Sequence, residues 1–376
     1  MKFRGLAGLV LAACGGGGGG GAVDAAVPVV DATVPVVDAA VPGPDAAGPV
    51  SDAAVPGPDA AVPVVDAAVS LPDAAAPDAA AAPDAAGFEQ DPARLDLHGP
   101  CPAAIRLGGF KVEANEADGY TAIDGVVKDG VAPNQIPDDA GQDGDCRLDR
   151  ARRLVCDPAC DPGQTCGLDG ACVPMPLGQD MGPVVFRGLV QPVELGPLQP
   201  GNTYFYTRLP HPGFTPGHVV QLTNTPGYFG PLELYGVGVE PIVPGEDTWA
   251  LAQGAPLTLH WTAPAADARS RVLIEINIDQ HGLSPVTLIC DVPDTGEVTL
   301  PQGATDGLMA AGVTGFPSGR LTRRTADSLT VDDRCVDFTV TSVRAVAVEV
   351  AGHVPCTRDA DCPPGELCDL LIQQCH

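Results

Sequence analysis

Cysteines constrain the fold of this chain more than any other residue type. The 376 residues include 13 cysteines, and all but Cys14 lie beyond residue 100. An even number of cysteines in an exported protein predicts a framework of disulfide bonds. These twelve form two local quartets and two wider pairs: Cys156, Cys160, Cys166 and Cys172; Cys356, Cys362, Cys368 and Cys375; Cys101 and Cys146; Cys290 and Cys335.

Each quartet is expected to close on itself, because it is too small to bury a core and depends on bridges for stability. The three, five or six residues between successive cysteines do not resemble the paired Cys-x-x-Cys knuckles of zinc sites. Pairing first with third and second with fourth predicts Cys156–Cys166, Cys160–Cys172, Cys356–Cys368 and Cys362–Cys375. For the other four we expect Cys290–Cys335 across a β-sandwich and Cys101–Cys146, with Cys146 facing Cys156 as an alternative.

The N-terminus resembles a bacterial lipoprotein signal. Lys2 and Arg4 precede an apolar run at residues 5–13, which suits a signal peptide and is far below the ~20 residues of a spanning helix. Leu11-Ala12-Ala13-Cys14 resembles a lipobox. This implies that residues 1–13 are removed and that Cys14 is lipidated, with several acyl chains as a durable anchor. An ordinary signal peptide with a chance cysteine is the alternative. Gly15 favours the outer membrane by the enterobacterial sorting rule.

A stalk is predicted after the anchor. Residues 14–21 combine the lipidated cysteine with a hinge of seven glycines, and residues 22–87 repeat Asp and Pro with a period of seven. A proline in every heptad excludes a continuous helix at about 3 kcal/mol each, so we expect a disordered tether with polyproline-II character. Slippage of a GC-rich repeat is an equally good origin for the segment.

Charge excludes one class of partner. The formal net charge is −28, and so acidic a chain repels phosphate backbones, which makes nucleic acid an improbable partner. Direct electrostatic attraction to anionic membranes is improbable on the same ground. Membrane attachment is therefore expected to come from lipid.

The rest of the chain predicts an all-β fold. Val272, Ile274, Ile276 and Ile278 alternate with polar residues, as in a half-buried strand. Similar stripes recur, one of them broken at Ser342 and Arg344, where we expect a bend. We therefore predict an N-terminal β segment with a Cys-rich module at 88–181, a β-sandwich at 182–352 and a C-terminal Cys-rich module at 353–376. Residues 257–264, Leu-Thr-Leu-His-Trp-Thr-Ala-Pro, resemble the second strand of a fibronectin type III module.

The whole pattern resembles cysteine-rich surface lipoproteins of myxobacterial type. The features shared are the lipobox, the Asp/Pro-rich stalk, a β domain carrying the segment Cys-Asp-Val-Pro-Asp-Thr-Gly at 290–296, and a closing Cys-rich module. The resemblance covers most of the chain. It implies a location at the outer membrane or cell surface and brings no assigned activity.

Two charged clusters are candidate binding residues. Asp138, Asp139, Asp143 and Asp145 could contribute to a calcium site, although they match no complete calcium-loop motif and a solvated acidic loop is the simpler interpretation. Arg320, Arg323 and Arg324 form a basic spot that could meet an anionic sugar or an acidic partner. The alternative is an exposed strand edge protected by charge.

These patterns favour a non-enzymatic envelope protein with a structural or interaction role and no cofactor. No nucleophile elbow, metalloprotease helix or phosphate-binding loop occurs in the sequence. The expected partners are the membrane, through the lipid, and an envelope protein or glycan. One alternative is a carbohydrate- or peptide-binding module, with or without the help of calcium, using exposed aromatic residues from the set Tyr204, Tyr206, Tyr228, Phe229 and Tyr235. A hydrolase with a site assembled from distant residues is a further alternative.

Overall fold

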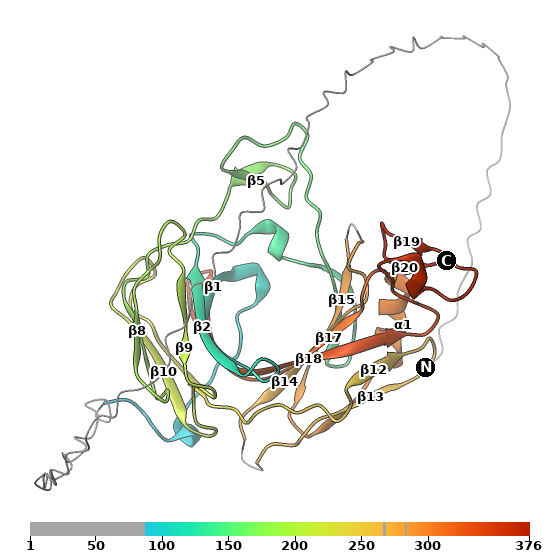
Figure 1. The fold of residues 1–376 in the computed structure, drawn as a ribbon. Helices are drawn as coiled ribbons and strands as arrows, with labels where there is room; N and C mark the ends of the chain where they lie inside the picture. The colour runs from blue at the N-terminus through green and yellow to red at the C-terminus, as the bar shows by residue number, and fades with distance from the viewer. Residues whose placement is uncertain (1–86, 266–267, 283) are drawn as a thin grey trace, which may run out of the picture. The chain divides into compact units, whose positions relative to one another are not determined.

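The computed structural model describes residues 87–265, 268–282 and 284–376 (Figure 1). The predicted signal peptide, Cys14, the glycine hinge and residues 22–86 of the stalk lie outside these residues. The described part is all-β, as predicted, with a single α-helix, α1 (Gln302–Ala311), among its described segments. Short 3-10 turns span Pro92–Arg94, Ala103–Ile105, Pro133–Gln135 and Asp359–Asp361.

One large mixed sheet organises the fold. Its strand order is β3-β4-β15-β14-β17-β18-β1-β2-β9, and β12 pairs with the far end of β18. Strands β1 and β12 run parallel to β18, whereas the other pairs are antiparallel. The strands are β1 (Arg106–Asn115), β2 (Tyr120–Val127), β3 (Asp138–Asp143), β4 (Cys146–Arg150), β9 (Tyr204–Leu209), β12 (Thr248–Leu251), β14 (Arg271–Asn277), β15 (Val286–Pro293), β17 (Ser318–Val331) and β18 (Arg334–Val350).

A second sheet covers one half of the large sheet and makes a sandwich. It consists of β7 (Val184–Arg187), β8 (Val193–Leu195), β10 (Val219–Asn224) and β11 (Glu233–Val237). Between the two sheets, the Phe110 ring packs edge-on against Phe186 and Tyr204, and Phe186 also contacts Phe338. These four side chains are at least 98% buried, so they form the centre of this core.

Smaller elements cover the other half of the large sheet. They are α1 and a two-stranded ribbon of β13 (Leu257–His260) and β16 (Glu297–Leu300). Their core includes Trp249, Trp261, Ile274 and Leu308. The segment that resembled a fibronectin strand thus does bury its tryptophan, but β13 pairs only with β16, and the large sheet has more strands than a fibronectin sheet.

Strand β18 joins the two cores. It runs without a break through Ser342, so the bend expected at Ser342 and Arg344 is wrong. Val336, Phe338 and Val340 belong to one core, whereas Val346, Val348 and Val350 belong to the other. The polar Ser342 lies between them, buried, where its hydroxyl donates to Glu116 Oε1 (2.7 Å) and accepts from the Ile242 amide (2.8 Å).

The boundary predicted at residue 182 does not divide the fold. Strands β1 and β2, from the predicted N-terminal segment, lie between β18 and β9 in the large sheet, and β3 and β4 extend the same sheet beyond β15. The parallel pairing of β1 with β18 places Phe110 opposite Phe338, although the two residues are more than 200 positions apart in the sequence. Residues 106–150 therefore belong to the sandwich itself.

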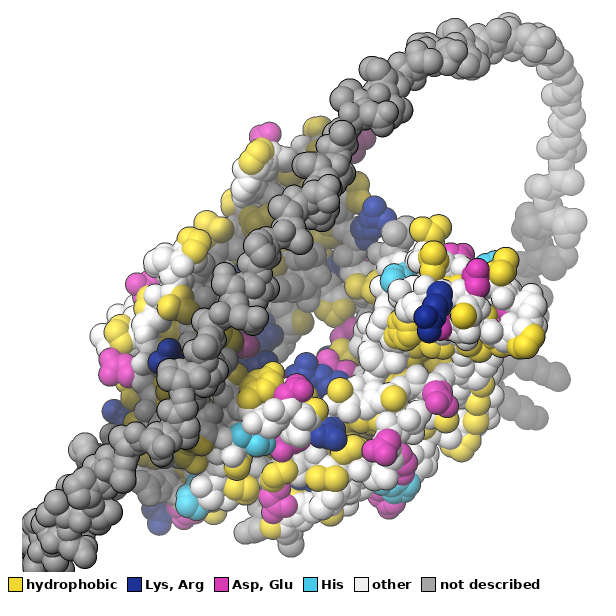
Figure 2. Space-filling view, in the orientation of Figure 1, with side chains coloured by type: hydrophobic (Ala, Val, Ile, Leu, Met, Phe, Trp, Pro, Cys, Tyr) yellow, Lys and Arg dark blue, Asp and Glu magenta, His cyan; other side chains and the backbone are white. Residues whose placement is uncertain are grey.

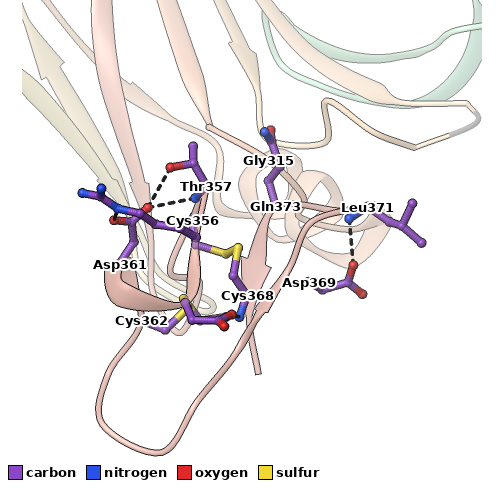
Figure 3. The surroundings of a disulfide bond; sticks show 12 residues. Gly315, Cys356, Thr357, Asp361, Cys362, Cys368, Asp369, Leu371 and Gln373 are labelled. Carbon is purple, nitrogen blue, oxygen red and sulfur yellow. Dashed lines mark hydrogen bonds and ion pairs between the residues drawn. A yellow bond between two sulfur atoms is a disulfide. The ribbon is translucent and has the colours of Figure 1, made fainter. Parts of the chain in front are cut away.

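The two cysteine quartets form small stapled ribbons. Strands β5 (Gln164–Cys166) and β6 (Cys172–Pro174) carry Cys156–Cys166 and Cys160–Cys172, while β19 (Cys368–Asp369) and β20 (Gln374–Cys375) carry Cys356–Cys368 and Cys362–Cys375. This connectivity is the predicted one. Figure 3 shows Asp361 beside the second ribbon, accepting from Thr357. Those hydrogen bonds lower the pKa of Asp361 to about 2.

The remaining disulfides differ from the prediction. Cys146 is bonded to Cys290, and Cys101 to Cys335, so the expected pairs Cys290–Cys335 and Cys101–Cys146 are wrong, as is the alternative Cys146–Cys156. Cys146 lies directly opposite Cys290 because β4 pairs with β15. Both bonds therefore tie the 101–150 region to strands of the central sheet.

A buried ion pair fixes the middle of the molecule. The side chains of Arg323 and Asp294 are 0% and 2% exposed, and Arg323 Nε donates to Asp294 Oδ2 at 2.7 Å. The rest of the guanidinium donates to the carbonyls of Glu240, Pro241 and Thr262. Asp294 also accepts from Trp261 Nε1 (2.7 Å) and from the Ser270 hydroxyl (2.6 Å). The pair thus connects β17 with three loops.

A polar contact attaches the segment before β1 to the sandwich. The Asp327 carboxylate accepts from the backbone amides of His98, Tyr235 and Ser328 and lies 2.9 Å from His98 Nδ1. This hydrogen bond, reinforced by the charge of Asp327, raises the pKa of His98 above its usual value. The residues before β1 are thereby attached to β17.

Candidate binding groove

Strand alternation gives the large sheet one apolar face and one polar face. Residues of one parity enter the two cores, and the neighbouring residues point to the opposite face. The large sheet is curved (Figure 1), and the space-filling view shows a hollow inside the curve (Figure 2). It is lined by Arg147 and Asp149 of β4, Ile289 and Asp291 of β15, Leu273 and Glu275 of β14, Arg320, Thr322 and Arg324 of β17, Asp337, Thr339 and Thr341 of β18, and Lys111 and Glu113 of β1.

Two adjoining cavities occupy this hollow. The larger has a volume of about 700 Å³ and lies over β4, β15, β14, β17, β18 and β1. The smaller, of about 350 Å³, lies over β1, β2 and β9 and is lined by Tyr120, Ala122, Asp124, Phe205 and Thr207. The two share Lys111 and Glu113. We refer to both cavities together as the groove.

Ion pairs cross the centre of the groove. Glu113 Oε2 lies 3.1 Å from Lys111 Nζ and 2.8 Å from Arg320 Nη2. Arg320 Nε is in turn 4.0 Å from Glu275 Oε2. Lys111 Nζ also lies 3.5 Å from Asp124 Oδ2, so this chain of five charges reaches from β2 over β1 and β18 to β14. It holds long side chains in fixed orientations with both donors and acceptors available.

Further ion pairs lie toward the ends of the larger cavity. Arg106 makes a bidentate contact with Asp337, at 2.9 and 3.0 Å. Arg324 donates to Asp291 at 2.9 Å, and Arg147 to Asp149 at 3.0 Å. The lining of the larger cavity therefore includes five basic residues and five acidic ones, and Asp124 of the smaller cavity is a sixth acidic residue. The groove is close to neutral, in contrast to the strongly acidic chain as a whole.

Thr322 carries an unsatisfied hydroxyl in this lining. The residue is 6% exposed, and its Oγ1 makes no hydrogen bond within the described part of the chain. It lies on β17 between Arg320 and Arg324, opposite Leu273 of β14. A buried hydroxyl without a partner costs about 1–3 kcal/mol. Such groups are rare in folded proteins.

Two exposed aromatic rings line the smaller cavity. Tyr120 is 41% exposed and Phe205 is 56% exposed, and Phe205 is paired with Asp124 across β9 and β2. The set proposed from the sequence does not supply these rings. Tyr204 is in the core, Tyr206, Phe229 and Tyr235 are half-buried, and Tyr228 is exposed but lies outside the groove.

The basic spot is not an exposed edge. Strand β17 is paired on both sides, with β14 and β18, so the interpretation as a protected edge is wrong. Alternation instead divides the three arginines between the two faces. Arg320 and Arg324 line the groove, whereas Arg323 points to the opposite face and is buried against Asp294.

The proposed calcium ligands are not brought together. Asp138 pairs with Arg152 at 2.7 Å, Asp139 accepts from the Gly141 amide, and Asp143 and Asp145 are exposed. No three of these carboxylates come within 4.8 Å of one another. The groups of that kind in the described residues are cysteine sulfurs, and all of them are in disulfides.

The groove has to be interpreted from its own chemistry. No protein-family model matches the sequence, and no curated protein is similar to it. In the described ranges, no helix has the length and apolar character needed to cross a bilayer. What the groove offers is side-chain donors, side-chain acceptors and two aromatic rings over a wide surface.

Proposed function

We propose that the protein is a non-enzymatic, lipid-anchored protein of the outer membrane or cell surface that binds an envelope ligand in the groove. The anchor rests on the lipobox-like residues before Cys14. The binding role rests on the groove, whose larger cavity of about 700 Å³ falls in the size range of ligand sites. The stalk would hold this groove away from the membrane.

One observation carries the binding role more than any other. The lining of the groove combines oriented charged side chains and a buried, unpartnered threonine hydroxyl with apolar residues such as Leu273, Ile289 and Phe205. A face with a purely structural purpose would be expected to be packed against another element or to be loosely solvated. Fixed polar side chains around a cavity are typical of a surface that orients a polar ligand.

Filling the groove tests this function. Thr339 lies on β18 at the floor of the larger cavity, so Thr339→Trp is expected to weaken binding of the purified protein to isolated envelopes at least tenfold. Thr258→Trp, on the exposed side of β13, is the matched control and should bind like the wild type. Both variants would be made in the full chain carrying Cys14→Ser, and binding would be measured as an isotherm. Equal binding by the two variants would contradict a role for the groove.

Removing the thiol at position 14 tests the anchor. In the proposal the acyl chains on Cys14 hold the protein in the bilayer. Among the residues that the structure describes, no helix could replace them as an anchor. Cys14→Ser is therefore expected to move the protein from the membrane fraction to the soluble fraction of lysed cells. Fractionation in high salt followed by immunoblotting measures this. If the variant still sediments with membranes, lipid at Cys14 is not the anchor.

A further inference from the structure

We infer that the ligand of the groove is a neutral oligosaccharide, with one sugar ring stacked on Phe205 and Tyr120 and others hydrogen-bonded along the ion pairs. This inference rests on the proposed function and names its ligand class. It is drawn from the pairing of the strands, the charge balance of the lining and the position of the aromatic rings.

Strand pairing determines which groups a ligand can reach. Seven of the strands in the groove, β4, β15, β14, β17, β18, β1 and β2, have hydrogen-bonded neighbours on both sides. Their backbone groups are used within the sheet, so an extended peptide cannot add to them as a further strand. Recognition in the groove must therefore come from side chains, which suits a ligand that carries many hydroxyl groups of its own.

Charge balance favours a neutral ligand. Each cation of the central chain has a carboxylate within 4.0 Å, so an anionic ligand would meet as much repulsion as attraction. A sugar hydroxyl can donate to Glu113 or Glu275 and accept from Lys111 or Arg320. Hydrogen bonds to charged groups are the strong ones, and neighbouring hydroxyls of one ring can satisfy both members of an ion pair.

The aromatic rings give the remaining part of the site. Phe205 and Tyr120 lie at the β9 end, beside Lys111, Glu113 and Asp124. Pyranose rings have an apolar face of C–H groups and a polar rim, so stacking on an aromatic ring removes apolar surface from water while the rim reaches charged neighbours. An exposed phenylalanine beside three charged side chains is the arrangement that such a ring requires.

The size of the groove indicates a chain of several sugars. From β9 to β4 the sheet order contains seven strand-to-strand steps, or roughly 30 Å at ~4.8 Å per step. A single monosaccharide would occupy a small part of this surface. Polymers of neutral sugars are long enough to run across the strands from the aromatic end to Arg147 and Asp149.

Calorimetry with defined glycans tests the inference. The full chain carrying Cys14→Ser would be titrated with neutral hexasaccharides of β-1,4-glucose, β-1,4-mannose, β-1,4-N-acetylglucosamine and α-1,4-glucose. An acidic hexagalacturonate, a basic glucosamine hexamer and an equimolar library of decapeptides serve as comparisons. At least one neutral hexasaccharide is expected to bind, and Phe205→Ala is expected to weaken that binding at least tenfold. Tyr228→Ala is the control, because Tyr228 has a similar exposed fraction to Tyr120 and lies outside the groove.

The outcomes separate the ligand class from the proposed function. Binding of a neutral hexasaccharide that Phe205→Ala weakens and Tyr228→Ala leaves unchanged supports the inference. Binding of only a charged hexamer or a peptide, blocked by Thr339→Trp, would overturn the inference and leave the groove as a binding site. If no hexasaccharide binds, or if Phe205→Ala and Tyr228→Ala behave alike, the oligosaccharide assignment is wrong.

Discussion

Replacing Arg323 by methionine is expected to lower the free energy of unfolding by about 3–5 kcal/mol, the usual cost of removing one partner of a buried ion pair. Methionine fills a similar volume but leaves the carboxylate of Asp294 buried with only the hydrogen bonds from Trp261 and Ser270. The carbonyls of Glu240 and Pro241 also lose a donor. Urea unfolding at neutral pH, followed by circular dichroism, measures the effect.

Two variants show whether burial is the cause. Arg320→Met removes an arginine from the same strand, but its side chain is 45% exposed and its partners face the groove, so the loss should be below about 1 kcal/mol. Adding Asp294→Asn to Arg323→Met should restore part of the stability, because the buried charge is then removed. Similar losses for Arg320→Met and Arg323→Met would contradict the stabilising role of the buried ion pair.

Removing the Cys146–Cys290 bond is expected to cost about 4–5 kcal/mol. The bond joins residues 144 apart in sequence, and closing a loop of that length restricts the unfolded chain strongly. The Cys156–Cys166 bond joins residues only 10 apart, for which the same relation gives about 3 kcal/mol. The double variants Cys146→Ala/Cys290→Ala and Cys156→Ala/Cys166→Ala therefore differ in their expected loss.

The two disulfides also differ in how deeply their cysteines are buried. Cys290 is fully buried in the core beside Leu288 and Val292, whereas Cys156 is half-exposed in a small ribbon. Guanidinium unfolding of the full chain should show the first variant destabilised cooperatively. The loss of about 3 kcal/mol in the second variant should fall on the β5–β6 ribbon and leave the large-sheet transition almost unchanged. A larger loss from Cys156→Ala/Cys166→Ala would contradict this account.

Local patterns in the sequence predicted local structure well. The alternation at Val272, Ile274 and Ile276 becomes the buried face of β14, because a strand between two layers has to separate apolar from polar side chains. The quartet bonds also agree with the prediction, because the two partners of each bond lie only 10 to 13 residues apart.

Long-range pairing could not be predicted from these patterns. Cys290 faces Cys146 because β4 lies beside β15. Cys335 is bonded to Cys101, which lies in the segment before β1. Each strand of a mixed sheet can satisfy its hydrophobic face beside many neighbours, so alternation predicts which side chains are buried but not which strands are adjacent. The false boundary at residue 182 has the same origin.

The groove was only partly visible in the sequence. The sequence shows Arg320, Arg323 and Arg324 as one basic spot, and their spacing along the strand is the signal that separates the first and last of them from Arg323. Glu113, Glu275 and Asp337 are common solvent-facing residues on isolated strands, and only the strand order brings them together. In the sequence Phe205 stands between two tyrosines, so nothing marks it as the exposed ring of the three. Tyr204, beside it, is in the core.

The most direct test of the groove as a binding surface is whether a bound ligand protects its lysine against acetylation. Besides Lys2 in the predicted signal peptide, the chain has only Lys111 and Lys128. Lys111 lines the groove with 34% of its side chain exposed, and Lys128 lies outside it. On adding isolated envelope fragments to the full chain, acetylation of Lys111, measured by mass spectrometry, is predicted to slow at least fivefold while that of Lys128 is unchanged. Unchanged acetylation of Lys111 under conditions where the protein is bound would contradict a ligand in the groove.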